Sequence, residues 1–249
     1  MEIALAKPDY GVDAPGVMRM FFLIGFACLA IAVLSPPVVR IGPVVFLMRS
    51  FFWPAGFLIG EGLLFLLYVK YGKFRHRDFM LGMHEWHGDE QVLDVGCGRG
   101  LLLAGAAKRI AQRNGNGHVI GIDIWSNTDM GGNSAAATEQ NLRLEGITEY
   151  CTLVSGPAQE MIFANGGFDL VVSNLCLHNI RERATRRRAL EQIVRVLKPG
   201  GTVILSDYKR TGEYATELCR MGLTVEKHRG SLVTTFPPLT VISARKPMA

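Results

Sequence analysis

The sequence is poor in the patterns that build metal centres and disulfide scaffolds. Its five cysteines are odd in number, and no two of them are spaced as Cys-x-x-Cys. They are Cys28, Cys97, Cys151, Cys176 and Cys219. His84 and His87 lie three residues apart around Trp86, but no obvious partner follows, and a zinc site needs further ligands. We therefore expect no metal site, a packing or entry role for both histidines, and a reducing compartment.

A clustered charge of one sign is also missing. The formal net charge is +5, and the basic residues form no face of the kind that binds nucleic acid. The densest basic group, in an expected helix over Arg181–Leu197, should mostly face solvent, with contact to anionic lipid headgroups as the alternative. It consists of Arg183, Arg186, Arg187 and Arg188. We therefore expect no nucleic-acid partner.

Apolar residues are abundant, and their excess lies in the first 70 positions. The run Phe21–Val39 has no charge over 19 residues, which is enough to cross the ~30 Å core of a bilayer as a helix. A second run, Phe51–Val69, is interrupted only by Glu61. The pattern predicts two transmembrane helices joined by a short loop over Ser35–Ser50, with a buried helical lid on a soluble enzyme as the alternative. Glu61 is expected to pair with Arg49 or to mark an oligomer contact.

Basic residues after the second run predict the orientation in the membrane. Lys70, Lys73, Arg75 and Arg77 favour the cytosolic side for the C-terminal domain. The expected layout is an N-terminal tail (1–16), a membrane hairpin (17–70), a linking helix (71–84) and a catalytic domain (85–249). Nothing in the sequence indicates an oligomeric state.

The most informative stretch of the chain is 92–100. It reads as a buried strand, a turn with Gly96, Gly98 and Gly100, and then a helix over Leu101–Ile110. A dinucleotide loop of this kind would cradle a pyrophosphate on the helix N-terminus. Asp94, two residues before the first glycine, would repel a pyrophosphate but would suit an ammonium group. The pattern therefore favours a nucleoside that carries an amino acid.

A second strand, Gly117–Asp123, ends in an acid about 20 residues after the glycines, where Asp123 can accept both ribose hydroxyls. Strands and helices then alternate, which predicts a doubly wound α/β sheet. The expected helices are Ser134–Glu145, with Ser134 as its N-cap, Arg181–Leu197 and Tyr214–Met221. The remaining strands are Cys151–Val154, the strand that starts at Phe168, Thr202–Ser206, Thr224–His228 and Leu239–Ala244.

Four of these motifs together resemble class I S-adenosylmethionine-dependent methyltransferases. They are Asp94–Gly100, Asp123, Phe168–Asn174 and Leu197–Gly201, and the resemblance covers about residues 85–247. It implies a Rossmann-like seven-stranded sheet with an antiparallel last strand, and S-adenosylmethionine as the cofactor. It also implies that Asp94 lies near the methionine amino group and that Asp123 binds the ribose.

Further cofactor contacts are expected around the carboxyl ends of the strands. Pro157 stands where the family commonly has an acid that contacts the adenine, so Ala158 or Gln159 is expected to substitute. Trp125 is expected to cover the adenine, to line the acceptor pocket or simply to pack in the core. The predicted cofactor residues are Asp94, Gly96, Gly98, Gly100, Asp123, Ile124, Trp125, Ala158, Gln159 and Asn174. Asp129 and Asn133 are expected to shape the substrate site.

His178 is the candidate general base, with a locally bonded loop histidine as the alternative. The resemblance also argues against methylation of exocyclic amines or amides, because family members that methylate them often carry an Asn-Pro-Pro-Tyr-like element where this chain has Ser173-Asn-Leu-Cys176. With no inserted recognition domain, the expected substrate is a small lipophilic acceptor, such as a quinone, isoprenoid, sterol or acyl lipid, taken from the membrane. The alternatives are a soluble small molecule with the hairpin as anchor only, or a membrane scaffold that binds S-adenosylmethionine without turnover. Asp94 and Leu197–Gly201 disfavour a nicotinamide oxidoreductase.

Overall fold

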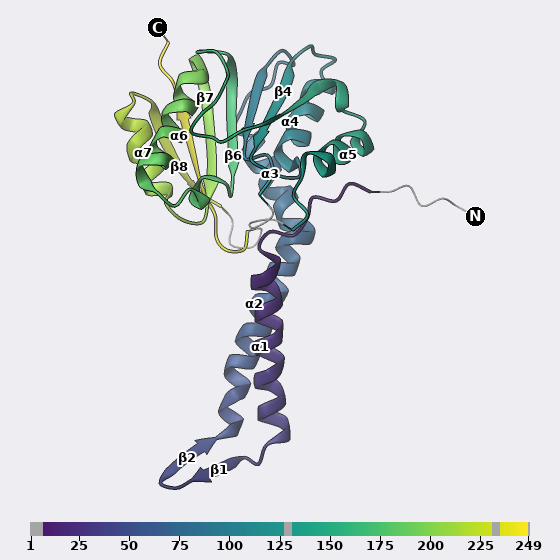
Figure 1. The fold of residues 1–249 in the computed structure, drawn as a ribbon, viewed down its shortest axis with the longest axis vertical. Helices are drawn as coiled ribbons and strands as arrows, with labels where there is room; N and C mark the ends of the chain where they lie inside the picture. The colour runs from purple at the N-terminus through teal and green to yellow at the C-terminus, as the bar shows by residue number, and fades with distance from the viewer. Residues whose placement is uncertain (1–6, 127–130, 231–234, 249) are drawn as a thin grey trace, which may run out of the picture.

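The structure is a computed structural model that describes residues 7–126, 131–230 and 235–248. It consists of an α/β domain and a long helical hairpin that projects from one edge of it (Figure 1). The N-terminal segment crosses the junction between the hairpin and the domain. The hairpin and the domain therefore meet at a single edge of the sheet.

The hairpin is formed by α1 (Pro15–Leu34) and α2 (Phe52–Leu67), which pack along their length. Glycines bring the two helices close together: a Cβ at Gly25 would lie 2.9 Å from Ile59 Cγ1, and one at Gly62 would lie 2.9 Å from the Phe22 ring. Where a loop was expected over Ser35–Ser50, the chain forms a small antiparallel pair, β1 (Val38–Ile41) and β2 (Val44–Leu47), and a 3₁₀ turn, η1 (Met48–Phe51).

The second arm of the hairpin continues into the domain without a break. α2 runs through a π-helical turn, η2 (Tyr68–Gly72), into α3 (Lys73–Leu81). The linking helix expected over 71–84 is thus the end of one long helical rod, and it stops at Leu81. Of the two roles expected for Glu61, pairing with Arg49 is wrong, because Arg49 Nη1 donates to the carbonyl of Ala32 at 3.1 Å and no ion pair joins it to Glu61 in the described part of the chain. The oligomer contact stays a prediction.

The domain is built on a seven-stranded sheet in the order β5-β4-β3-β6-β7-β9-β8. Strands β3 to β7 are parallel, and β9 lies antiparallel between β7 and β8, so the expected antiparallel last strand is confirmed. The fold class, a Rossmann-like α/β sheet of seven strands, agrees with this topology. The strands are β3 (Gln91–Val95), β4 (His118–Asp123), β5 (Cys151–Ser155), β6 (Phe168–Asn174), β7 (Leu197–Asp207), β8 (Thr224–Arg229) and β9 (Thr240–Arg245).

Two apolar layers cover the sheet because its central strands bury both faces. Leu93 and Val171 point to one side, into a core with α6 (Arg183–Val196) and α7 (Thr211–Arg220). Val92 and Val172 point to the other side, into a core with α3 and α4 (Leu101–Ala111). Helix α5 (Ala135–Glu145) follows β4, and short 3₁₀ turns η3 (Thr148–Tyr150) and η4 (Leu177–Asn179) complete the chain.

Local features of the domain both confirm and correct the sequence-based expectations. The N-cap role of Ser134 is confirmed, since its hydroxyl accepts from the Ala137 amide at 3.2 Å. The strand expected over Thr202–Ser206 is longer than predicted, because β7 already begins at Leu197, where the preceding helix was expected to end. Arg186 does not face solvent: its side chain is buried and forms a bidentate ion pair with Glu213, with N–O distances of 2.8–3.0 Å.

Candidate functional site

The glycine turn after β3 lies at the edge of the sheet where the parallel strands end. Gly96 has a φ of +73°, and a Cβ there would lie 2.1 Å from Cys176 Sγ, so both the backbone conformation and the close approach of the next loop require glycine. Gly100 has a φ of +85° and caps α4. The Thr138 hydroxyl on α5 donates to the Gly98 carbonyl at 2.7 Å and holds the turn from outside.

Asp94 sits directly beneath this turn, at the start of α4. Its Oδ2 accepts from the Leu103 amide at 2.9 Å, while Oδ1 is buried without a hydrogen-bond partner. Burial raises the pKa of this carboxyl to about 8. An unpartnered buried carboxylate oxygen is costly unless a donor from a ligand completes it. The geometry therefore suits the ammonium group that the sequence predicts.

Asp123 ends β4 and connects the next loop to the glycine turn. Its Oδ2 accepts from the Gly98 amide at 2.8 Å, and its Oδ1 accepts from the Trp125 amide at 2.6 Å. Asn133 Nδ2 lies 3.5 Å from the same Oδ1, so this residue, expected to shape the substrate site, stands against the candidate ribose acid. The carboxylate is thus oriented at the crevice but remains partly exposed to solvent.

The remaining predicted nucleoside contacts lie around the ends of β4 and β5. The Trp125 indole donates to Ser155 Oγ at 2.7 Å, with the residue in a left-handed conformation (φ +57°). Ile124 is exposed, and Ala158 and Gln159 are half-buried after β5. Asp129 lies outside the described residues. The adenine roles of these positions stay predictions.

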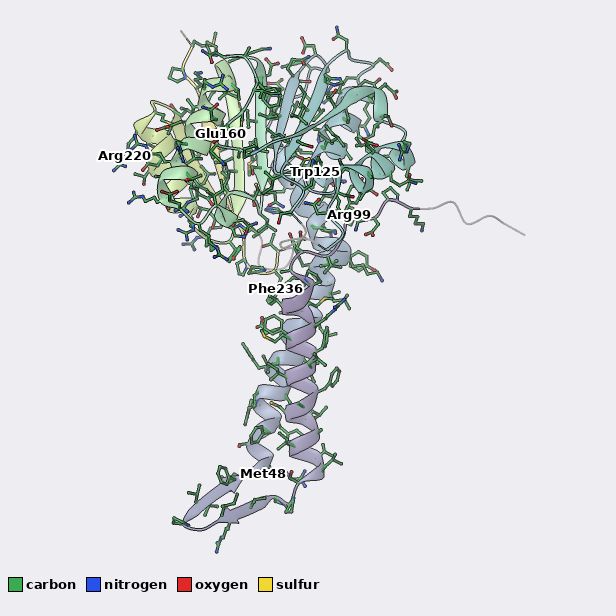
Figure 2. The ribbon with its side chains drawn as sticks, in the orientation of Figure 1. Met48, Arg99, Trp125, Glu160, Arg220 and Phe236 are labelled. Carbon is green, nitrogen blue, oxygen red and sulfur yellow. The ribbon has the colours of Figure 1, made fainter. Side chains whose placement is uncertain are left out.

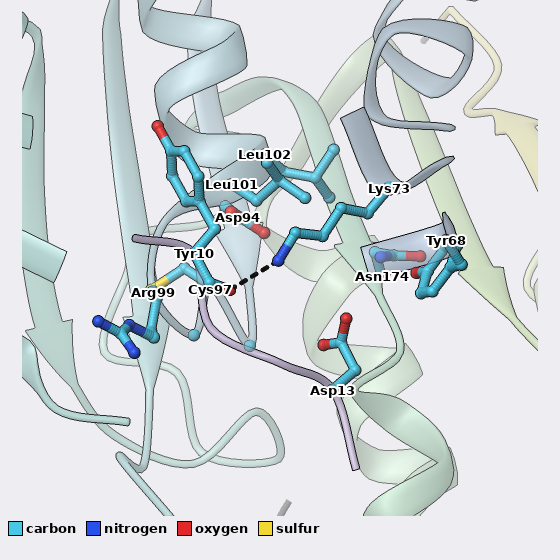
Figure 3. A pocket seen from close by; sticks show the side chains of 12 residues that line it. Tyr10, Asp13, Tyr68, Lys73, Asp94, Cys97, Arg99, Leu101, Leu102 and Asn174 are labelled. Atoms are coloured by element: carbon cyan, nitrogen blue, oxygen red, sulfur yellow. Dashed lines mark hydrogen bonds between the residues drawn. The ribbon is translucent and has the colours of Figure 1, made fainter. Parts of the chain in front are cut away.

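A small cavity lies between the glycine turn and the base of the hairpin (Figure 3). Asn174, at the end of β6, lines it, and its Oδ1 is buried without a hydrogen-bond partner. The cavity is therefore lined both by residues of the predicted amino-acid subsite of the cofactor and by residues that no motif identified. The other residues that line it are Tyr10, Asp13, Tyr68, Lys73, Asp94, Gly96, Cys97, Gly98, Arg99, Leu101 and Leu102.

The N-terminal segment 9–13, here called the strap, closes one side of the cavity. Asp9 exchanges two backbone hydrogen bonds of 2.8 and 2.9 Å with the Asn141 side chain and forms an ion pair of 2.9 Å with Arg99. The Tyr10 hydroxyl donates to Glu145 at 2.6 Å. Sequence reasoning placed these residues in a tail. The only signal was two acids, Asp9 and Asp13, before the first apolar run.

His178, the candidate base, lies in η4 beyond the end of β6. Its Nδ1 is 2.9 Å from Asp207 Oδ1, and Asp207 also accepts from the Tyr214 hydroxyl at 3.1 Å and from the Tyr208 amide at 2.8 Å. An ionised carboxylate only accepts, so Nδ1 carries the proton and Nε2 is left as the acceptor. Asp207 was missed, although an acid at the end of the fifth predicted strand was visible. The role of His178 stays a prediction.

Two cysteine thiols of the domain are buried, and the two histidines around Trp86 differ in their surroundings. Burial raises the pKa of the thiols of Cys151 and Cys176 to about 12, so both stay protonated and poorly nucleophilic. His84 packs edge-on against Trp86, whereas His87 is exposed. In the described ranges, no group of three or more His, Cys, Asp or Glu side chains is arranged to hold a metal ion.

Part of the chain is similar in sequence to known methyltransferases. Residues 93–205 match a family model described as a methyltransferase domain. The chain is 35% identical over 130 residues to a demethylmenaquinone methyltransferase of Symbiobacterium thermophilum, covering 52% of this chain and 46% of that protein. It is 28% identical over 145 residues to a chloroplastic 2-phytyl-1,4-beta-naphthoquinone methyltransferase of Arabidopsis thaliana, covering 57% and 52%. The matches therefore span about half the length of these relatives.

Solved structures share the fold. A methyltransferase from Aquifex aeolicus, described as dependent on S-adenosylmethionine, aligns with a TM-score of 0.53 at 17% identity, covering 68% of this chain and 88% of that one. The unpartnered Asp94 and Asn174 oxygens and the oriented Asp123 fit the amino-acid and ribose parts of that cofactor. The family match, the fold and the site together support a class I methyltransferase domain with S-adenosylmethionine as its cofactor.

Proposed function

We propose that this chain is a membrane-anchored methyltransferase that transfers the methyl group of S-adenosylmethionine to a small lipophilic acceptor of quinone type. The observation that carries the proposal is the position of the cavity. Asp13 lies two residues before the start of α1 and Tyr68 immediately follows α2, and both line the same cavity as Asp94 and Asn174. An acceptor that moves along the hairpin would therefore arrive at the methyl donor.

The surface of the hairpin supports a bilayer as its environment. By length and composition, Pro15–Leu34 and Met48–Leu81 are each able to cross a membrane, and the 20 residues of α1 give a length of about 30 Å. Large apolar side chains stand out from it, with Leu23 72% and Trp53 84% exposed. Figure 2 shows carbon-rich side chains on the hairpin in contrast to the charged surface of the domain. A buried lid would hide these side chains.

The direction of the chain relative to the membrane is part of the proposal. Lys70, Lys73, Arg75 and Arg77 lie where the second arm enters the domain, which favours the cytosolic side for the domain. In this arrangement the carboxyl edge of the sheet, where open α/β folds bind ligands, faces the membrane surface (Figure 1).

The acceptor class rests on chemistry and on the relatives. The relatives' names describe methylation of menaquinone precursors and of a phytyl naphthoquinone. When bound, S-adenosylmethionine supplies an electrophilic methyl group on its sulfonium. The chain would orient the acceptor carbon in line with that bond, and orientation of this kind contributes about 7–11 kcal/mol. His178, with Nδ1 held by Asp207, would take the proton that the acceptor releases.

The test uses the full chain in lipid nanodiscs with methyl-labelled S-adenosylmethionine. Two acceptors are compared: a reduced, unmethylated naphthoquinone with an isoprenoid tail, and the same ring without the tail. The expected result is label in the organic phase, with a strong preference for the tailed acceptor. Asp123→Ala should abolish transfer, whereas the matched variant Asp89→Ala, at an exposed acid before β3, should not.

Each other outcome contradicts part of the proposal. Equal methyl transfer to the tailed and the tail-less acceptor would mean that the hairpin serves only as an anchor. Label only in water-soluble products of a total cell extract would point to a soluble acceptor. Cofactor binding without transfer to any acceptor in that extract would indicate a non-catalytic scaffold.

A further inference from the structure

Two charged side chains at the base of the hairpin reach the cofactor cavity without belonging to any cofactor motif. Asp13 is in the strap, two residues before α1 begins, and Lys73 is the first residue of α3, just beyond the second arm. Both line the cavity with Asp94 and Gly98 (Figure 3). The two ends of the hairpin thus contribute opposite charges to one place.

Lys73 is held so that it faces the cavity. Its Nζ donates to the carbonyls of Tyr10 and Gly11 at 3.1 and 2.5 Å, and the side chain is only 5% exposed. An ammonium has three donors, so one remains after these two bonds. No carboxylate lies within ion-pair distance of Lys73 in the described residues. Burial lowers the pKa of Lys73, and the charges of Asp13 and Asp9 oppose that change without forming an ion pair with it.

The charges of the cavity match the amino-acid end of the cofactor. Asp13 and Asp94 provide two carboxylates and Lys73 provides one ammonium, while the other cation of the lining, Arg99, is paired with Asp9 at 2.9 Å. Burial raises the pKa of Asp13 and the charge of Lys73 opposes that rise, so a further cation beside Asp13 would favour its ionised form. S-adenosylmethionine carries an ammonium, a sulfonium and a carboxylate, which is the complementary set.

The cavity is too small for the cofactor while the strap is closed. Its volume is about 50 Å³, room for only a few water molecules. The strap is held on its outer side by Arg99, Asn141 and Glu145. On its inner side it is held by Lys73 and by the buried Tyr10 ring, which packs edge-on against Phe74. A ligand the size of the cofactor therefore requires the strap to move away from these contacts.

We infer that Asp13 and Lys73 bind the amino-acid end of S-adenosylmethionine, with Lys73 on its carboxylate and with Asp13 and Asp94 each on one of its cationic groups. The strap opens to admit the cofactor and closes over it. Asp123 at the end of β4 holds the ribose, and its Oδ2 bonds to the Gly98 amide, which lines the cavity. The amino-acid tail of a nucleoside placed there points toward these two residues. This inference does not depend on the nature of the methyl acceptor.

The test is equilibrium binding of two nucleosides to the full chain in detergent. S-adenosylhomocysteine has the amino-acid end, and 5′-methylthioadenosine lacks it. Lys73→Met and Asp13→Asn are each expected to weaken S-adenosylhomocysteine roughly 10- to 100-fold, the usual effect of losing a charge-assisted hydrogen bond. Binding of 5′-methylthioadenosine should change less than about twofold. Lys70→Met, one turn earlier on the same rod and outside the cavity, should change neither.

Several results would overturn the inference. One such result is unchanged binding of S-adenosylhomocysteine by the two variants. A second is tighter binding, which would mean that the strap merely blocks the site. A third is equally weakened binding of both nucleosides, which would indicate damage to the fold. A wild-type chain that binds neither nucleoside overturns the inference together with the cofactor. Selective loss of S-adenosylhomocysteine binding supports it even if no acceptor is ever methylated.

Discussion

Asp94 shows how a single buried carboxyl can couple ligand binding to pH. Burial raises its pKa from 3.8 to about 8, with the charge of Asp123 acting in the same direction and the hydrogen bond from the Leu103 amide opposing it. Between these two values the folded, empty protein holds a proton that the unfolded chain would release. Its stability against unfolding therefore falls as the pH rises through this window.

The first prediction is that binding of S-adenosylhomocysteine expels this proton, because the ligand's ammonium favours the ionised carboxylate. Affinity should rise by up to about tenfold per pH unit from about pH 5 and level off near pH 8. Calorimetry in two buffers of different ionisation enthalpy measures the proton directly. Asp94→Asn should remove the proton release. Affinity that is flat over this range, with no dependence on the buffer, contradicts the assignment.

Arg186 carries the second prediction at this scale. The guanidinium is 1% exposed and pairs with Glu213, whose side chain is 17% exposed. Removing one partner of such a pair leaves a buried charge, so Arg186→Met should lower the free energy of unfolding by about 3 kcal/mol. The neighbouring Arg188→Gln, on the exposed face of α6, should change it by less than about 0.5 kcal/mol. Thermal unfolding of the two variants decides the matter, and equal midpoints would refute the buried pair.

Arg186 also shows why residue-level expectations from sequence can fail. A run of arginines is normally solvated, and the sequence was interpreted in that way. Yet Arg186, Leu190 and Ile193 repeat at helical spacing, so the position lies on the buried stripe of α6. Its partner Glu213 lies 27 residues away on α7, and no local sequence pattern predicts a pair over that separation.

At the scale of elements, the strands of the domain were the most predictable part. β3, β4 and β6 are short apolar runs buried on both faces and bounded by glycine or acid, and they begin or end within a residue of their expected limits. The ligand-binding turn followed from its glycines and Asp94. The strap was not predictable, because it has no periodicity and its contacts with α5 join residues 132 positions apart.

The third prediction concerns the hairpin as an element. The full chain should stay in the membrane pellet on carbonate extraction, because its apolar surface has no other cover. Leu23→Asp together with Phe57→Asp, at exposed positions on the two arms, should release much of it, since each acid costs about 3 kcal/mol at the centre of a membrane helix. Ile162→Asp, at an equally exposed apolar residue of the domain, is the matched control. Release of the unmodified chain would contradict an integral hairpin.

At the scale of the whole molecule, the orientation can be tested with one engineered cysteine. Ile41, at the far end of the hairpin, is 66% exposed, and Cys219 is an exposed native thiol of the domain. The fourth prediction is that a membrane-impermeant maleimide labels Ile41→Cys in intact cells, while Cys219 reacts only after the membrane is permeabilised. Labelling in the opposite order would place the domain outside.

The continuous rod from α2 through η2 into α3 has a consequence for which acceptors the enzyme can use. In the proposed membrane arrangement, a flexible linker would let the domain search above the lipid, whereas a helix that enters the domain without a break would fix the height of the methyl donor. In such a bilayer, the length of the rod would determine the depth at which an acceptor can react. An acceptor would be selected by how far its reactive carbon rises toward the headgroups, so two lipids with the same ring at different depths would not be equivalent substrates.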